Sequence, residues 1–242
     1  MQQGNRTRRV LILGGTSLAR QAANALVEQG VSVVTSLAGV TPSPMLPKGE
    51  VRLGGFGGAA GLAEFIAARQ FDLVVDATHP FAAQISRHAF EACSRVKLVR
   101  LEAPAWKKQP GDDWMEVGSI ANAVSSIDSG ARVAVTVGRK EIAPFFTRGD
   151  IAGVARMISA PDVAAPAYWT LLLERPPFTL EQEMLLLRDH AIGVVVSKNA
   201  GGLRVAKLDA AAQLKLLVIM VQRPEKPSVE KIATVPELII RL

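Results

Sequence analysis

The chain has 242 residues and a net charge of +6, with 49% apolar residues, 5% aromatic residues and one cysteine. This composition is typical of a folded α/β protein and excludes a disordered chain. A single cysteine cannot form an internal disulfide, and with three scattered histidines it leaves no zinc-type cluster. We therefore expect no metal site and a reducing, cytoplasmic location.

The distribution of apolar and charged residues limits the partners. No apolar run reaches the ~20 residues of a membrane span, and the apolar stretch behind the basic N-terminus is too short for a secretory signal. The positive charge favours anionic partners. Dispersed basic residues and scarce aromatic side chains argue against nucleic acid, and a small polyanionic ligand explains the charge equally well.

The first half of the chain alternates short apolar runs with helical patterns. Strands are predicted at residues 9–13, 31–35, 71–75 and 96–101, and helices at residues 18–29, 61–69 and 81–93. A glycine turn separates the first strand from the first helix, so the chain opens as a βαβ unit. Pro104, Pro110 and Gly111 then mark a crossover between two halves.

The second half repeats this alternation. Strands are predicted at 132–137, 154–158, 191–196 and 216–221, and helices at 119–127, 179–188, 207–213 and 235–240. Thr179 and Gln182 form a capping-box pattern. Strands that alternate with helices imply parallel sheets. We expect an α/β fold of two Rossmann-like domains, residues 1–102 and 103–242, with the cofactor and substrate cleft between them.

Polar residues follow two of the apolar runs directly. Residues 73–75 lead into Asp76-Ala77-Thr78-His79-Pro80-Phe81, and residues 194–196 lead into Ser197-Lys198-Asn199-Ala200-Gly201-Gly202. Ligands of open α/β sheets bind beyond the carboxyl ends of the strands. Polar groups at such positions in both halves predict one cleft that is lined from two sides.

The turn Gly14-Gly15-Thr16-Ser17 lies between a strand and a helix, where phosphate can approach backbone N–H groups. It lacks the full GxGxxG pattern, so a dinucleotide site and an ordinary tight turn are equally supported. The next strand ends at Ser36 without the carboxylate of an NAD site. If the cofactor is a nicotinamide, this favours NADP; otherwise Ser36 is a simple loop residue.

Several side chains at predicted strand ends could carry chemistry. His79 could donate a proton near neutral pH, or it is a structural histidine bonded to backbone. Asp76 is expected to cap the turn that follows it. Arg139 and Lys140 are an anion site by type, or a solvated turn. Lys198 and Asn199 combine an amine and an amide, which favours an anionic or carbonyl ligand.

The order of several motifs makes the chain resemble the precorrin-6A reductase family of cobalamin biosynthesis over almost its whole length. The motifs are LILGGTSLAR (11–20), VRLGGFGG (51–58), DATHPFAAQIS (76–86), TVGRKEI (136–142) and VVSKNAGG (195–202). The resemblance implies two Rossmann-like domains that bind NADPH and neither flavin nor metal. It also implies reduction of one carbon–carbon double bond of precorrin-6A, or of its cobalt analogue. The substrate would be a polycarboxylated tetrapyrrole.

The resemblance assigns roles to individual positions. Those expected to bind the cofactor are Gly14, Thr16 and Ser17 at the pyrophosphate, Ser36 at the 2′-phosphate, and Gly55, Phe56, Gly57, His79, Pro80 and Phe81 at the nicotinamide. Those expected at substrate carboxylates or the far end of the cofactor are Arg139, Lys140, Lys198 and Asn199. His79 and Lys198 are candidate proton donors, with solvent as the alternative.

One departure from the family pattern concerns cofactor choice. Val40 stands where members often carry an arginine, so either Arg52 replaces that cation or discrimination against NADH is weaker. A generic NADP-dependent reductase and a two-lobed nucleotide-binding module are the competing interpretations. The residues do not decide between a metal-free and a cobalt-loaded substrate. The oligomeric state also stays open, and a monomer is compatible with two lobes that cover each other.

Overall fold

The computed structural model describes residues 7–39 and 45–242, and the chain divides into two compact units. The first unit contains the chain up to Pro104 together with Glu225–Leu242, and the second contains Ala105–Pro224. Each unit is built on one six-stranded sheet, and every strand pair in both sheets is parallel. The predicted α/β class is confirmed.

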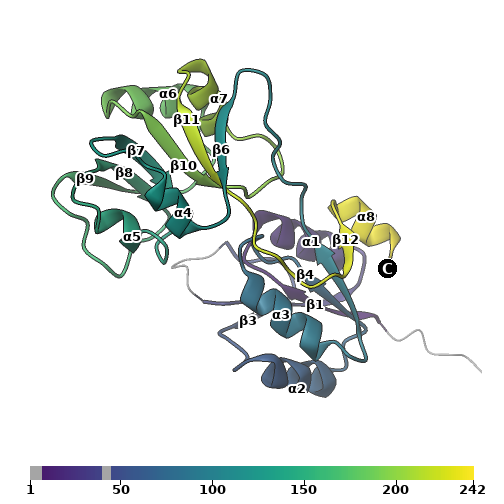
Figure 1. Ribbon diagram of the computed structural model, residues 1–242. Helices are drawn as coiled ribbons and strands as arrows, with labels where there is room; N and C mark the ends of the chain where they lie inside the picture. Colours follow the sequence, from purple (N-terminus) through teal and green to yellow (C-terminus); the bar gives the residue numbers. More distant parts are fainter. Residues whose placement is uncertain (1–6, 40–44) are drawn as a thin grey trace, which may run out of the picture. The chain divides into compact units, whose positions relative to one another are not determined.

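The first sheet has the strand order β3-β2-β1-β4-β5-β12, the 3-2-1-4-5-6 arrangement of dinucleotide-binding sheets. The elements of this unit, most of them labelled in Figure 1, are β1 (Arg9–Leu13), α1 (Ser17–Glu28), β2 (Ser32–Leu37), β3 (Glu50–Leu53), α2 (Ala59–Arg69), β4 (Leu73–Asp76), α3 (Ala83–Ala92), β5 (Lys97–Leu101), β12 (Glu230–Ile232) and α8 (Val235–Ile240).

The second sheet, in the order β9-β8-β7-β10-β11-β6, repeats this arrangement with β7 as its first strand. Its elements are β6 (Asp113–Val117), α4 (Ile120–Ser125), β7 (Arg132–Thr136), α5 (Ala143–Phe146), β8 (Ala152–Met157), β9 (Trp169–Leu173), α6 (Leu180–Asp189), β10 (Val194–Lys198), α7 (Ala206–Gln213) and β11 (Leu217–Val221). The predicted capping box of α6 is present, with Thr179 as the N-cap and Gln182 as its partner.

Helices cover both faces of the first sheet, which explains why its central strands are apolar throughout. Val10 and Ile12 of β1 pack with α1 and α8 in one core cluster. Leu11 and Leu13 point to the opposite face and pack with α2 and α3. Successive side chains of a strand point to opposite faces, so a strand buried on both faces cannot alternate apolar with polar residues.

The strands that the sequence pattern did not predict are the edge strands of the two sheets. They are β3 and β12 in the first sheet and β6 and β9 in the second. An edge strand has only one strand neighbour, and three of these four contain charged residues, for example Asp113 and Glu116 in β6. These three therefore lack the continuous apolar run that identifies a central strand. This reason does not apply to β9, which carries no charged residue and was missed by the prediction. The short helix α5 was missed as well.

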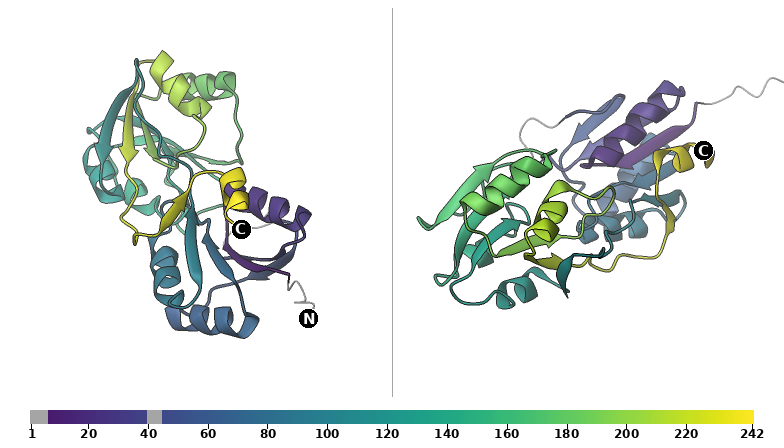
Figure 2. Two further views of the ribbon diagram at one scale, coloured as in Figure 1. Left: turned by 90° about the vertical axis from the view of Figure 1, so that its right-hand side faces the viewer. Right: turned by 90° about the horizontal axis from the view of Figure 1, so that it is seen from above.

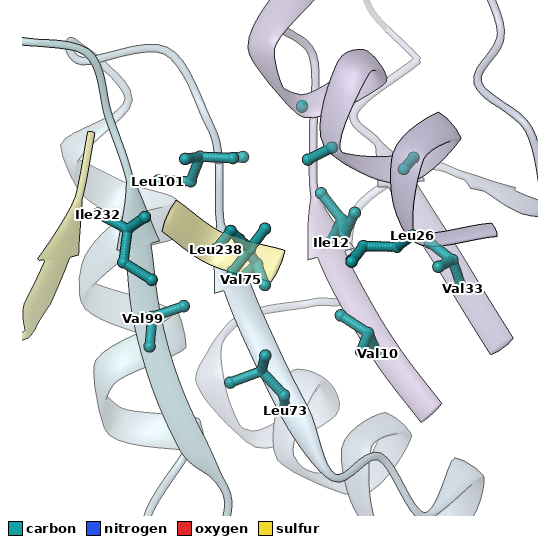
Figure 3. Packing of buried hydrophobic residues seen from close by; sticks show 14 residues of the cluster. Val10, Ile12, Leu26, Val33, Leu73, Val75, Val99, Leu101, Ile232 and Leu238 are labelled. Atoms are coloured by element: carbon teal, nitrogen blue, oxygen red, sulfur yellow. The ribbon is translucent and has the colours of Figure 1, made fainter. Parts of the chain in front are cut away.

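The C-terminal segment differs from the predicted domain boundary, which placed residues 225–242 in the second domain. β12 instead pairs with β5, with Ile232 opposite Leu101, and α8 packs beside α1 (Figure 2). Ile232 and Leu238 are fully buried in the core of the first unit together with Val75 and Leu101 (Figure 3). A strand of three residues carries no periodicity that could reveal this long-range pairing.

We predict that Leu238→Ala destabilises the first unit, because it removes a buried side chain from that core. The expected loss is about 2–5 kcal/mol in the free energy of unfolding. Urea titration with hydrogen exchange of peptides from β1 and from β10 measures it unit by unit. Ile240→Ala is the control, since Ile240 lies on the same helix but is 85% exposed. A loss of hydrogen-exchange protection confined to the β10 peptide would contradict this assignment of the C-terminal segment.

Candidate functional site

The strand order of the first sheet reverses between β1 and β4, and such a reversal opens a crevice at the carboxyl ends of the strands. The chain leaves β1 through Gly14–Ser17 and leaves β4 through Ala77–Phe81. Thr16 joins the two exits, because its Oγ1 donates to the carbonyl of Ala77 at 2.9 Å. The same oxygen accepts from the N–H of Ala19 at 3.0 Å and caps α1. The structure thus brings the predicted glycine turn and His79 to one crevice.

The turn after β1 needs its glycines. A Cβ at Gly14 would lie 2.9 Å from Cγ2 of Thr35, and Gly15 has a left-handed φ of 115°. The N–H of Gly14 donates to the carbonyl of Ser36 at 2.9 Å, which holds the turn against the end of β2. Beyond it, α1 begins at Ser17, where the first N–H groups of a helix lack partners within the helix. This arrangement suits a phosphate group.

Arg52 lies next to Ser36 at the end of the neighbouring strand β3. Its Nη1 is 3.4 Å from Oγ of Ser36 and donates to the carbonyl of Gly54 at 2.5 Å, while Nη2 donates to the carbonyl of Gly55 at 2.8 Å. The guanidinium stacks on the ring of Phe56, 4.0 Å from its centre. Arg52 therefore orders the glycine-rich loop and also places a cation beside Ser36. Val40, which stands where members of the family often carry an arginine, lies outside the residues that the structure describes.

Asp76 anchors the exit of β4. Its Oδ1 accepts from Oγ1 of Thr78 at 2.6 Å and from the N–H of Thr78 at 3.3 Å, as expected of a turn cap. Its Oδ2 lies 3.2 Å from Nε of Arg100, and both side chains are almost completely buried. Burial alone would raise the pKa of Asp76, but hydrogen bonds from Thr78 and Ser86 and the charge of Lys226 hold it below its ordinary value. The sequence pattern did not reveal Arg100.

His79 is exposed at the crevice and is tied to the backbone, so it combines features of both interpretations. Its Nδ1 accepts from the N–H of Phe81 at 3.2 Å, and the two rings lie 5.7 Å apart. A neutral histidine whose Nδ1 accepts carries its hydrogen on Nε2. Pro80, between His79 and Phe81 in the chain, is buried. The backbone carbonyl of His79 accepts a hydrogen bond from the ammonium group of Lys226 at 3.3 Å.

The second sheet reverses its strand order between β7 and β10, and the predicted basic residues lie at these two strand ends. Lys198, the last residue of β10, forms an ion pair with Glu141 from the loop after β7. Arg139 of that loop pairs with Asp162 at 3.0 Å. Lys140 is exposed, and no ion pair involves it in the part of the chain that the structure describes.

Asn199 has a different role from the one expected. Its Oδ1 accepts from the N–H of Trp106 at 2.8 Å, and its Nδ2 donates to the carbonyl of Trp106 at 3.0 Å. Asn199 is only 2% exposed. Because both atoms of the amide bind one backbone unit, Asn199 holds the Trp106 segment rather than presenting its amide to a substrate carboxylate.

Lys207 at the start of α7 is a partly buried cation that the sequence pattern did not reveal. Its Nζ donates to Oγ1 of Thr136 at 2.8 Å and lies 5.9 Å from the centre of the Trp106 ring. Burial lowers the pKa of Lys207 to about 8, although the charge of Glu183 opposes the shift. Lys207 lines a cavity of about 10 Å³ together with the buried ion pair of Arg156 and Glu183. This cavity has room for one water molecule at most.

We predict that Lys207 makes stability depend on pH in the alkaline range. The folded protein releases this proton at about pH 8 and the unfolded chain near 10.5. Between these values the unfolded state binds more protons, so the free energy of unfolding rises with pH. Urea titrations across this interval should show a smaller rise for Lys207→Met than for the natural protein. Lys215→Met, which changes an exposed lysine, should keep the full rise; identical curves for all three proteins would refute the assignment.

Each unit thus has the strand order of a dinucleotide-binding sheet and carries polar side chains at its reversal point, which places the chain among two-unit Rossmann-type proteins. A family model described as precorrin-6x reductase CbiJ/CobK matches residues 9–241. The chain belongs to this family and is an oxidoreductase.

Individual relatives agree with this family. The precorrin-6A reductase of Rhodococcus erythropolis is 47% identical over 90% of each chain. A solved structure of CobK precorrin-6A reductase matches with a TM-score of 0.91 and 37% identity, covering 98% of this chain and 96% of that one. A cobalt-precorrin-6A reductase, from Methanothermobacter thermautotrophicus, is 32% identical over 68% of this chain and 59% of its own length. None of the helices described here is long and apolar enough to span a bilayer.

Proposed function

We propose that this protein reduces one carbon–carbon double bond of precorrin-6A with NADPH, giving precorrin-6B. The observation that carries this proposal is the carboxyl edge of the first sheet, where a capped helix start, a glycine turn and the Ser36–Arg52 pair lie at adjoining strand ends. These are the features that bind the pyrophosphate and the 2′-phosphate of a dinucleotide. The similarity to precorrin-6A reductases supports the substrate.

The proposed cofactor contacts follow the strand ends. The pyrophosphate binds at Gly14, Thr16 and Ser17, because N–H groups at the start of α1 are available there. Ser36 and Arg52 bind the 2′-phosphate. The nicotinamide, which supplies the hydride when the cofactor is bound, is assigned to the β4 exit beside His79, Pro80 and Phe81. Gly55, Phe56 and Gly57, which were first expected there, follow the edge strand β3, which is separated from β4 by β2 and β1. Because Arg52 bonds this loop and stacks on Phe56, we assign the loop to the 2′-phosphate end of the cofactor instead.

The substrate contacts belong to the second unit. We assign Arg139, Lys140 and Lys198 to carboxylates of the tetrapyrrole, since cations at the carboxyl edge of a sheet suit a polyanionic ligand. The metal-free substrate is favoured over the cobalt-loaded one. Relatives named precorrin-6A reductase are 38–47% identical to this chain, whereas those named cobalt-precorrin-6A reductase are 25–32% identical.

Reduction adds a hydride to one carbon and a proton to its neighbour, so the protein must also admit a proton. His79 is exposed, and in its neutral form, with Nδ1 accepting from Phe81, its hydrogen is on Nε2; the ammonium group of Lys198 lies beside Glu141. Both are proposed donors, with solvent as the alternative. The remaining task of the protein is to orient the substrate and to neutralise its charge.

The deciding experiment follows the loss of NADPH absorbance with purified protein and enzymatically prepared precorrin-6A, with NADH in parallel. Turnover with NADPH is the expected result. Binding of NADPH without turnover would contradict the proposed substrate, and failure to bind either cofactor would contradict the dinucleotide site.

We predict that Arg52→Gln weakens the preference for NADPH over NADH. Only NADPH has a 2′-phosphate, and a charge-assisted hydrogen bond contributes about 1.5–3 kcal/mol. The ratio of kcat/KM for the two cofactors should fall by about tenfold or more. A purely structural effect on the loop would lower both values and leave the ratio unchanged. Arg69→Gln is the control, because Arg69 is a neighbouring arginine paired with Glu50.

We predict that Lys198→Ala impairs substrate use more than cofactor binding. The KM for precorrin-6A should rise by about tenfold, as expected when a charged contact of about 1.4 kcal/mol is lost. The Kd for NADPH, measured by fluorescence, should stay within about twofold. An equal loss of both would place Lys198 at the cofactor.

A further inference from the structure

Two of the three cations assigned to substrate carboxylates already have an acidic partner within the protein. Lys198 is paired with Glu141 and Arg139 with Asp162, which leaves Lys140 with its full charge. A substrate with several carboxylates needs more cations than this, because an ion already paired gains less from a second partner. Further basic residues must therefore lie near this edge of the second sheet.

Lys107 and Lys108 meet this requirement. Both side chains are exposed, and within residues 45–242 neither takes part in an ion pair. The carboxylate of Asp112 is affected by the charge of Lys108 but is already bound by both Nη atoms of Arg204, at 2.6 and 3.0 Å. The two lysines therefore keep their charge available for a ligand.

The segment that carries these lysines is fixed at the exit of β10. Trp106 is bound through its N–H and its carbonyl by the amide of Asn199, the residue directly after Lys198. Its indole N–H donates to the carbonyl of Leu203 at 3.1 Å. At the other end, the N–H of Gln109 donates to Asp112 at 2.8 Å. Asp112 directly precedes Asp113, the first residue of β6, so the segment runs from the carboxyl edge at Trp106 toward the amino edge of the sheet. Lys107 and Lys108 directly follow the anchor at the carboxyl edge.

The side chain of Asn199 holds the Trp106 segment beside the end of β10. An amide side chain that both accepts from and donates to one residue imitates the pairing of a neighbouring strand. Among neutral side chains, only the longer glutamine has the same amide group, with an acceptor oxygen beside a donor nitrogen. Asn199 is buried, so breaking this pair of hydrogen bonds leaves unsatisfied polar groups and releases the segment.

We propose that Lys107 and Lys108 bind carboxylates of the anionic substrate, and that Asn199 is the positioning residue that holds them at the carboxyl edge of the second sheet. The inference rests on the proposed function, because it takes a polycarboxylated tetrapyrrole as the ligand. It adds two specificity-determining cations to those that the family resemblance implied.

The first test is the double variant Lys107→Gln/Lys108→Gln, with direct binding of precorrin-6A in the absence of NADPH as the readout. The Kd should rise by about fivefold or more, and the Kd for NADPH should not change. The control is Lys215→Gln/Lys231→Gln, which removes the same net charge from two exposed lysines outside this edge. Equal effects of the two double variants would overturn the proposal, since only overall charge would then matter.

The second test separates positioning from direct contact. Asn199→Ala should raise the Kd for precorrin-6A in the natural background, and it should add little in the Lys107→Gln/Lys108→Gln background. An undiminished effect in that background would mean that Asn199 touches the substrate itself and would overturn its positioning role. Hydrogen exchange of residues 105–112 checks that Asn199→Ala releases this segment while β10 stays protected.

The same experiments separate this inference from the proposed function. Binding of precorrin-6A that depends on Lys107 and Lys108, without NADPH oxidation, would support the inference and refute the reductase assignment. Turnover that is insensitive to both lysines would support the reductase and refute the inference. Absence of any precorrin-6A binding by the natural protein would refute both.

Discussion

Parallel pairing of every strand is the constraint on which this protein depends. Parallel strands send all their carboxyl ends to one edge of a sheet, and the reversal between β1 and β4 or between β7 and β10 opens a gap at that edge. The first unit places Gly14, Thr16 and His79 at its gap, and the second places Arg139 and Lys198 at its own. Function is thereby confined to loops, while the apolar strands remain free to form the core.

Connections between residues far apart in the chain hold these loops in place. Arg100 is buried with Asp76, and its Nη1 also donates to the carbonyl of Pro227 at 3.1 Å. This single guanidinium links the exit of β4 to the returning C-terminal segment, which supplies the sixth strand of the first sheet. The sixth strand of the second sheet, β6, comes from its beginning instead. A buried ion pair of this kind is costly to break, since removing one partner leaves an uncompensated charge.

The second unit shows how charge is divided between structure and ligand. Glu141, Asp162 and Asp112 neutralise lysines and arginines that help to shape the loops. Two exposed loop cations, Lys140 and Lys107, have no acidic partner among the residues described. Lys207 is the opposite case, because it is partly buried and its lowered pKa reflects the cost of keeping a charge away from water.

The sequence by itself determined the α/β class, the central strands, most helices and the positions of the glycine turns, because these depend on local periodicity and on φ values that favour glycine. Its motifs also indicated the family. Tertiary structure alone decided the edge strands, the return of residues 225–242 to the first unit, the pairing of Asp76 with Arg100, and the bond from Asn199 to Trp106. The two side-chain contacts join residues 24 and 93 positions apart in the chain, and even the edge strands β3 and β9 pair with residues 16 positions away. Such contacts leave no periodic signal, since they depend on where the folded chain brings distant groups together.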